Sequence, residues 1–433
     1  MKYVVFILAA FLAVPTMALL AAMSRRGRAL VLVLLVSSPA LGSFAKINFW
    51  SEELYRGPDR GFEVTLTDLA AASLALALLI KPPGKIKWIP PASLVLILYF
   101  ACAVFSLAWT PEPLYSSFTI FKLLRCGLIY WTVANAVRSR RDLRAVLGGW
   151  MIAALVTGGI AFVQKYFLGV WRINGPFDHS NTVPLYLNLV IGPVLMWALA
   201  DPEMMSFVRV SALASVLGML FAVLGTFSRA GIALSGLAFG ATLCVAAVRA
   251  PSRRTLGIAF VAGILALAGA IKAAPRVINR FENAEVESIQ ARGEFNEAAL
   301  MMVSDSPLGV GINVFPLVMA QPRYMHHVRV MANEPSPGVV HNIYLLTAAE
   351  LGICGLLVFL SVLARFLWIA VATATRRVSF ESLIAASLAI GMLALHGSGF
   401  LEWAFRITPV CYQFAFVAGL TAALRLRPTL ERG

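Results

Sequence analysis

One histidine lies at a position suited to proton transfer. His341 comes immediately before a long apolar segment that begins at Asn342. If that segment is a helix, the partial positive charge at its N-terminus disfavours the imidazolium ion and keeps His341 neutral near pH 7. A neutral imidazole can act as a general base. The alternative is a structural histidine that caps the helix.

Two arginines occupy positions suited to an anionic ligand. Ser228 and Arg229 interrupt two apolar segments at a short turn, where a guanidinium group and the free N–H groups of the next helix would form a phosphate site. Arg292 lies on a helical apolar stripe and needs a carboxylate, a backbone acceptor or an anionic ligand. The structural alternatives are lipid headgroups for Arg229 and a nearby glutamate for Arg292. The other members of the stripe are Ile289, Phe295, Ala299 and Met302.

Further polar side chains suggest that the arginines belong to a larger cluster. Lys122 and Arg125 share one helical face inside an apolar segment, where cations usually face a cavity or a partner. Arg172 and Asn181 lie in a polar stretch between two apolar segments. The cations together would suit a polyanionic ligand that enters from the membrane, such as a lipid diphosphate. Weaker candidates in turns on the same predicted side are Asp178, His179, Glu402 and Arg406.

Composition predicts the elements that carry these residues. Of 433 residues, 60% are hydrophobic and 13% are charged, and the mean hydropathy is +0.81. This composition excludes a soluble globule, a disordered chain, collagen and a coiled coil. An outer-membrane barrel is disfavoured because the apolar residues form unbroken runs and do not alternate. The sequence therefore predicts an all-α, polytopic bundle of transmembrane helices with 12 to 13 spans of roughly 20 residues each.

The apolar runs give three regions of the chain. We expect spans one to ten within residues 1–274, a large loop at 275–340, and spans eleven to thirteen within 341–433. A loop of this length is usually functional or disordered. The thirteen candidate spans are 4–23, 29–47, 64–80, 90–109, 114–137, 145–170, 182–200, 207–227, 230–248, 256–274, 342–372, 383–399 and 409–423.

The charge distribution predicts the orientation. The chain has 36 Lys and Arg against 21 Asp and Glu, a net charge of +15 that in a soluble protein would suggest a nucleic-acid partner. Here the basic clusters follow odd-numbered spans, so the positive-inside rule places those connections and the C-terminus in the cytoplasm. The N-terminus and the 275–340 loop are then external, and a nucleic-acid partner is disfavoured. We expect the first span to be retained, although it could be a cleaved signal peptide, because Arg25, Arg26 and Arg28 flank it.

The cysteines give no sign of a metal or disulfide site. All five lie within predicted spans, and no two have metal-ligand or disulfide spacing. We expect them to pack as small apolar residues and expect neither a metal nor a cofactor. They are Cys102, Cys126, Cys244, Cys354 and Cys411.

Several short motifs, taken in order, resemble the O-antigen ligase and polymerase family. They cover roughly residues 171–359 and run from Arg172, Gly175 and Asn181 through 228–231, Arg292, 305–311 and Phe315 to 341–342, 350–352 and Gly355. The resemblance implies a glycosyltransferase of the bacterial inner membrane that takes a glycan from undecaprenyl diphosphate. The acceptor in this family is lipid A core for ligases, another lipid-linked repeat for polymerases, or a protein hydroxyl. It also implies that Arg229 and Arg292 hold the diphosphate and that His341 is the base. The ligases usually have twelve spans, one fewer than predicted here.

The residue chemistry is compatible with that role. Arginines can stabilise a diphosphate leaving group without a metal, and His341 can deprotonate the acceptor hydroxyl, which favours a single displacement with inversion. Glu350 would lie about 14 Å below His341 along the helix and is expected to be structural. One rival is a transporter or flippase, but Gly192-Pro193 would interrupt span seven without a counterpart in another half. The other rival is a non-catalytic partner in polysaccharide export.

Overall fold

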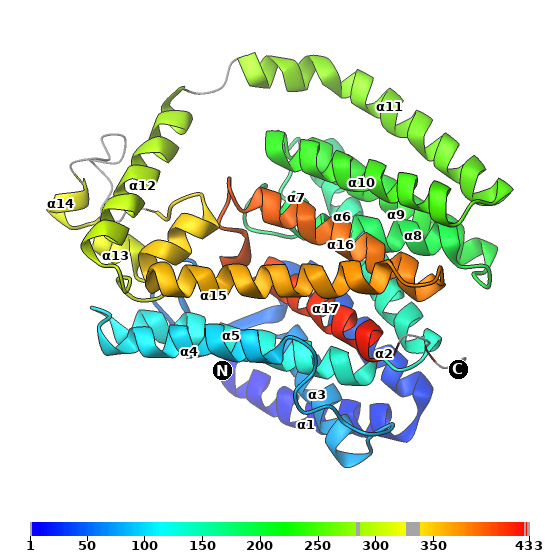
Figure 1. Ribbon diagram of the computed structural model, residues 1–433, viewed down its shortest axis with the longest axis horizontal. Helices are drawn as coiled ribbons and strands as arrows, with labels where there is room; N and C mark the ends of the chain where they lie inside the picture. The colour runs from blue at the N-terminus through cyan, green and yellow to red at the C-terminus, as the bar shows by residue number, and fades with distance from the viewer. Residues whose placement is uncertain (1, 283–285, 326–337, 428–429, 431–433) are drawn as a thin grey trace.

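Each predicted span corresponds to helical structure in the computed structural model, which describes residues 2–282, 286–325, 338–427 and 430 (Figure 1). Boundaries differ from the predicted ones by a few residues in most cases. The helices at the predicted spans are α1 (Lys2–Met23), α2 (Arg25–Ser37), α3 (Leu66–Ile80), α4 (Ser93–Phe105), α5 (Pro113–Ala136), α6 (Arg140–Tyr166), α7 (Thr182–Leu187) with α8 (Ile191–Ala200), α9 (Ser206–Gly225), α10 (Arg229–Arg249), α11 (Arg253–Glu282), α15 (Ile343–Ala374), α16 (Phe380–Ser398) and α17 (Thr408–Leu426).

The predicted fold class is confirmed. Among the described residues, seven helices are long and apolar enough to cross a membrane, and three shorter helices are also apolar. The chain is therefore a multi-pass, all-α membrane protein. Helices α16 and α17 are mostly buried inside the bundle, whereas α1 exposes large apolar side chains such as Leu8, Phe11 and Leu12, as expected for a surface in contact with lipid.

A β-hairpin follows the second helix and was not predicted. The predicted span at 29–47 ends as an α-helix at Ser37, and a 3₁₀ segment, η1 (Ser38–Ala45), leads into β1 (Lys46–Ser51) and β2 (Gly61–Thr65). The strands are antiparallel, with Lys46 opposite Thr65. The apolar run extends to Ile47, so the short strand could not be distinguished from the end of a helix by hydropathy.

The seventh predicted span is divided into two helices. α7 ends at Leu187 and α8 begins at Ile191. Pro193 has no backbone N–H, and its ring would clash with the carbonyl of Leu189 in a continuous helix. The interruption that Gly192-Pro193 predicted is therefore present, a few residues before the proline.

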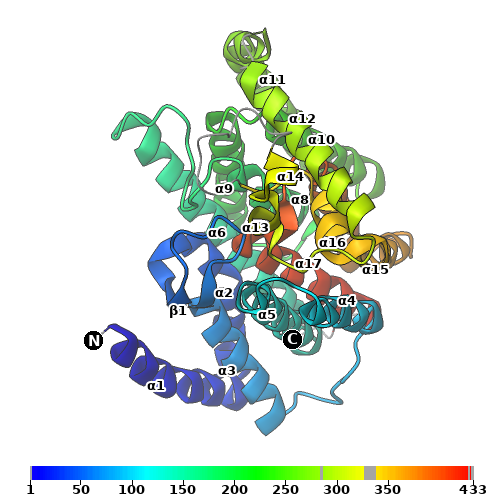
Figure 2. The same ribbon diagram turned by 90° about the vertical axis from the view of Figure 1, so that its left-hand side faces the viewer.

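The large loop contains helices that gather at one end of the bundle. α11 continues through Pro275 to Glu282, and α12 (Val286–Asp305), α13 (Phe315–Met319) and α14 (Pro322–Met325) follow. α12, α13 and α14 lie at the left of Figure 1, and Figure 2 looks onto this end, which we call the loop end. Phe295, Ala299 and Met302 are buried, as the apolar stripe predicted, while the side chain of Ile289 lies outside the described residues.

The glycine-rich turn after α12 packs into a kink of α15. The N–H groups of Val310 and Gly311 donate to the carbonyls of Ala349 and Glu350, both at 2.9 Å. Gly352 has φ +69°, and a Cβ there would lie 2.3 Å from the carbonyl oxygen of Pro307, so only glycine fits the kink. Because these N–H groups join the loop to α15, packing accounts for the glycines of the 305–311 motif. The two N–H groups are not available to bind a phosphate.

Candidate functional site

His341 is held at the loop end by the cap of α15 and by a glutamate from another turn. Asn342 is the N-cap of α15, and its Oδ1 accepts the N–H groups of Tyr344 at 3.0 Å and Leu345 at 3.1 Å. The N–H of Ile343, the residue after Asn342, donates to the carbonyl of Gly399 at the end of α16. These contacts place His341 beside the turn that follows α16, where its Nδ1 lies 3.1 Å from Oε2 of Glu402.

The contact with Glu402 fixes which nitrogen of His341 can accept a proton. Burial raises the pKa of Glu402, but the hydrogen bond with His341 and the charges of His341, Arg292 and His179 outweigh it and hold the pKa below its ordinary value. Glu402 is therefore ionised at neutral pH, and a carboxylate can only accept a hydrogen bond. Nδ1 of His341 must then carry the proton, which leaves Nε2 as the acceptor in the neutral ring.

Two further predicted residues contact the same carboxylate, and a third is joined to it through Asn181. Nη2 of Arg292 lies 3.2 Å from Oε1 of Glu402, and the side-chain amide of Asn181 donates to that same oxygen. Arg172 donates to Oδ1 of Asn181 and, through Nε, to the carbonyl of Thr226 at 2.9 Å. Residues from α12 and from the α6–α7, α9–α10 and α16–α17 connections thus meet around Glu402.

Arg229 lies close along the chain to this cluster. It is the first residue of α10, three residues after Thr226, which Arg172 contacts, and its side chain is half-buried. Ser228 is the N-cap residue, and its side chain makes no capping hydrogen bond. The turn therefore places Arg229 at the N-terminus of α10, the end of a helix that favours an anion.

Lys122 and Arg125 instead form buried ion pairs. Nζ of Lys122 lies 2.7 Å from Oδ1 of Asp59, and Nη1 of Arg125 lies 2.9 Å from Oδ2 of Asp68. Within the described residues, neither cation forms a hydrogen bond or an ion pair with Glu402. Both are almost fully shielded from solvent, so each needs a carboxylate, and the hairpin and α3 supply one each.

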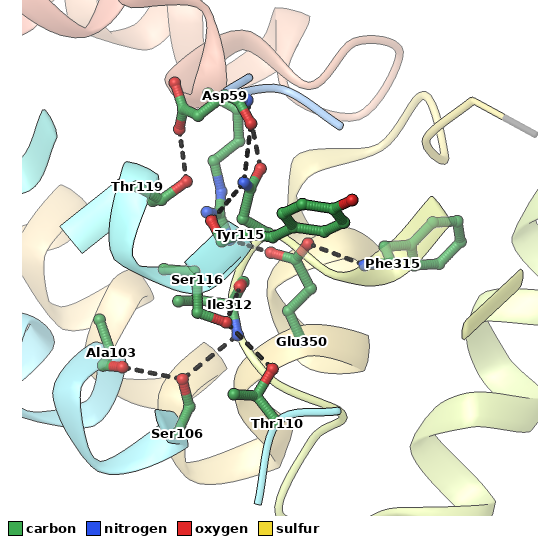
Figure 3. Close-up of polar contacts among 12 residues, drawn as sticks. Asp59, Ala103, Ser106, Thr110, Tyr115, Ser116, Thr119, Ile312, Phe315 and Glu350 are labelled. Atoms are coloured by element: carbon green, nitrogen blue, oxygen red, sulfur yellow. Dashed lines mark hydrogen bonds and ion pairs between the residues drawn. The ribbon is translucent and has the colours of Figure 1, made fainter. Parts of the chain in front are cut away.

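A third buried pair involves two other residues that the sequence singled out. Arg406, in η4 (Ala404–Arg406), pairs with Glu350 of α15. Figure 3 shows Glu350 also facing the N–H of Phe315, and Asp59 accepting the hydroxyl of Thr119. Glu350 is structural, as predicted, because its carboxylate joins α15 to η4 and to the start of α13.

A cavity of about 420 Å³ opens beside the His341–Glu402 pair. His179 also lines it, and Nδ1 of this ring accepts the N–H of Asn181 at 3.2 Å. Burial lowers the pKa of His179 below its ordinary value, so the ring is neutral at pH 7 and its Nε2–H is a donor. Other walls of the cavity come from η1, the hairpin, the turn after α16 and the start of α17.

The sequence identified the members of the site but not its centre. Glu402 is 61 residues from His341 and follows no motif, so it could be named only as one of several acids and bases in turns predicted to be external. The cations of the hairpin were not named, because the hairpin itself was not predicted. Within the described residues, no group of three or more His, Cys, Asp or Glu side chains is placed to hold a metal ion.

Comparison with known proteins identifies one segment of the chain. Residues 214–360 match the model of a family described as O-antigen ligase. The matched segment contains Arg229, Arg292 and His341, and it ends before Glu402. No curated protein matches the sequence.

Proposed function

Because the chain belongs to the O-antigen ligase family through residues 214–360, we propose that it transfers a glycan from undecaprenyl diphosphate to an acceptor hydroxyl. The acceptor is lipid A core or a growing polysaccharide. The single observation that carries the proposal is the Nδ1 contact of His341 with Glu402, since it orients a base that borders a cavity.

The reaction is a single displacement. Nε2 of His341 takes the proton from the acceptor hydroxyl while its oxygen forms a bond to the anomeric carbon. The bond between that carbon and the diphosphate oxygen breaks, and the electron pair leaves with the diphosphate. Glu402 stabilises the imidazolium ion that forms, because its carboxylate already accepts the Nδ1 proton. Attack opposite the leaving group inverts the anomeric configuration.

The arginines neutralise the leaving group. Arg229, Arg292 and Arg172 remain charged at all relevant pH values and bind phosphate oxygens with two N–H groups each. Preorganised donors stabilise the charge that develops on the diphosphate, so this step needs no metal ion. Contacts with Glu402 and Asn181 hold two of these arginines next to the base before substrate arrives.

The proposed reaction takes place on the periplasmic side of the inner membrane. The basic clusters after odd-numbered spans support a cytoplasmic C-terminus and an external loop end. A reporter that is active only in the cytoplasm, fused after residue 427, should be active, and a fusion within the 171–181 connection should be inactive. The reverse pattern would contradict this orientation.

The direct test uses purified protein in lipid nanodiscs with undecaprenyl-diphosphate glycan and lipid A core. The wild type should transfer the glycan with inversion, and His341→Ala should lower the rate by about 10²–10⁴-fold, the usual contribution of a general base. Lengthened lipid-linked chains would identify a polymerase. A product that keeps the anomeric configuration would exclude the single displacement, and absence of transfer to either acceptor would refute the enzyme assignment.

A matched variant separates chemistry from folding. His396 lies in α16 and contacts the ring of Phe405, and it does not line the cavity. His396→Ala removes the same side chain but should leave transfer per folded molecule close to that of the wild type. A flippase or a non-catalytic export partner would instead tolerate His341→Ala as well as His396→Ala.

A further inference from the structure

Side chains from a second part of the chain line the same cavity as His341 and Glu402. They come from η1 and the β1–β2 hairpin, which precede the segment that matches the family model. Two of them, Arg56 and Arg60, lie in the loop that joins the strands. Arg172, Arg229 and Arg292, which we assign to the diphosphate, are not among the lining residues.

This arrangement leaves the cavity for the acceptor, which is the second substrate of the proposed reaction. A general base must lie within hydrogen-bond reach of the hydroxyl that it deprotonates. Nδ1 of His341 is occupied by Glu402, and Arg292 meets that carboxylate without lining the cavity. If the arginines hold the donor diphosphate, the acceptor hydroxyl must reach Nε2 of His341 through the cavity. This step rests on the proposed function.

Buried contacts hold the hairpin loop in one conformation. The hydroxyl of Tyr55 donates to the carbonyl of Asn313, and the ring stacks on Tyr115 with centroids 4.1 Å apart. Four residues on, the N–H of Asp59 donates to Oδ1 of Asn313 at 3.2 Å, and Nδ2 of Asn313 donates back to the carbonyl of Asp59 at 2.9 Å. Asn313 belongs to the loop that packs on α15, so the hairpin is fastened to the segment that carries the family match.

The anchors determine where the two arginines lie. Tyr55 and Asp59 are buried, and the residue after each of them, Arg56 and Arg60, is exposed on the cavity wall. Because the anchors are fixed, little backbone entropy is lost when a ligand binds to the guanidinium groups. The loop is therefore a preorganised binding element.

Arg60 is available to an acidic ligand on this wall. Lys46 lies between two carboxylates, Glu63 at 3.3 Å and Asp178 at 3.8 Å, and Glu402 is paired with Arg292, which does not line the cavity. No carboxylate in the described part of the chain forms an ion pair with Arg60. Guanidinium groups bind carboxylate and phosphate with two parallel hydrogen bonds.

The rest of the lining suits a sugar. It combines hydroxyl and amide groups, most of which also bond to other protein groups, with aromatic rings that can pack on a pyranose face. The volume of about 420 Å³ lies within the range of small-molecule sites, roughly 300–1,000 Å³. The polar and aromatic lining residues include Ser38, Thr65, Thr67, Phe177, Asn181, Trp403 and Thr408.

We infer that this cavity is the acceptor subsite and that it takes a glycan bearing a carboxylate or phosphate group, which Arg56 and Arg60 bind. The acidic group is placed on or next to the sugar whose hydroxyl faces His341. The family-matched segment then supplies the donor chemistry, and residues 38–67 select the acceptor.

The test measures saccharide binding by the full-length protein in nanodiscs. The probes are cellobiouronic acid, cellobiose 6-phosphate and neutral cellobiose, compared by calorimetry. At least one acidic disaccharide should bind about tenfold or more tightly than cellobiose, as expected for one charge-assisted hydrogen bond. The stronger of the two identifies the acidic group as carboxylate or phosphate.

Variants assign that preference to the hairpin. Arg60→Ala and the pair Arg56→Ala with Arg60→Ala should remove the preference for the acidic probe and leave cellobiose binding unchanged. Arg253→Ala, which removes an exposed arginine at the start of α11, is the matched control and should keep the preference. Thermal unfolding of each variant checks that it is folded.

Two results would overturn the inference. One is equal affinity for the acidic and neutral probes, including no binding of either, and the other is a preference that Arg60→Ala leaves intact. Undecaprenyl diphosphate binding is measured on the same samples and should be unchanged in Arg60→Ala. If the wild type transfers glycan but shows no hairpin-dependent preference, the acceptor subsite is wrong and the proposed function stands. Failure to bind undecaprenyl diphosphate would count against the proposed function itself.

Discussion

The substitution Glu402→Gln tests the centre of the site, because it replaces one carboxylate oxygen with an NH₂ group without changing the shape of the side chain. The carboxylate has two oxygens, which receive donors from Arg292, Asn181 and His341. Glutamine has one oxygen and one NH₂ group. If its oxygen keeps Arg292 and Asn181, its NH₂ group faces Nδ1 of His341.

That arrangement would reverse the tautomer of the histidine. Nδ1 would become the acceptor, the proton would move to Nε2, and the nitrogen that faces the acceptor would lose its lone pair. The expected loss in transfer rate is therefore as large as removal of the base, about 10²–10⁴-fold. At 1.36 kcal/mol per factor of ten, this corresponds to about 3–5 kcal/mol of transition-state stabilisation.

The assay is single-turnover glycan transfer in nanodiscs, which separates chemistry from product release. Glu402→Gln in the His341→Ala background should cause little further loss, because residues that act as one unit are not additive. The control is Glu381→Gln, which breaks a comparable pair with Arg140 at 3.0 Å at the start of α16. A wild-type rate for Glu402→Gln, with His341→Ala inactive, would refute the orienting role.

The other predictions concern stability, measured by thermal or denaturant unfolding in detergent. Because the folded-state pKa of Glu402 is lowered, its ionised form stabilises the fold above the ordinary value of 4.5, and this contribution is lost as pH falls through the lowered value. Glu402→Gln should therefore flatten the acid limb of the stability profile, and an unchanged acid limb would contradict the assigned contacts. Gly352→Ala should destabilise by more than about 1 kcal/mol, because φ is +69° and its Cβ would meet Pro307, whereas Gly236→Ala meets nothing within 4 Å and should be neutral or stabilising. Equal effects of the two would argue against the kink. Lys122→Met should destabilise by about 3–5 kcal/mol because it leaves Asp59 buried without its cation, and adding Asp59→Asn should restore part of that loss. No recovery in the double variant would show that Lys122 acts other than through Asp59.

The sequence alone determined the fold class and the boundaries of most helices. Long apolar runs must become helices in a bilayer, because every backbone N–H and C=O group needs a partner inside the segment. Local signals of that kind also gave the break near Pro193 and the buried stripe of α12. The motif residues around His341 and Arg292 were found for the same reason, since each is recognisable from its immediate neighbours.

Only the tertiary structure decided how these residues are joined. Glu402 receives donors from segments far apart in the chain, and no periodicity relates residue 402 to residues 181, 292 and 341. Sequence reasoning grouped Lys122 and Arg125 with the other cations, but the carboxylates of Asp59 and Asp68 lie close enough to pair with them. A buried charge takes whichever partner the packing brings within reach, and packing depends on the whole chain. The cavity wall formed by the hairpin has the same origin, because Tyr55 and Asp59 are fixed by Asn313, more than 250 residues away.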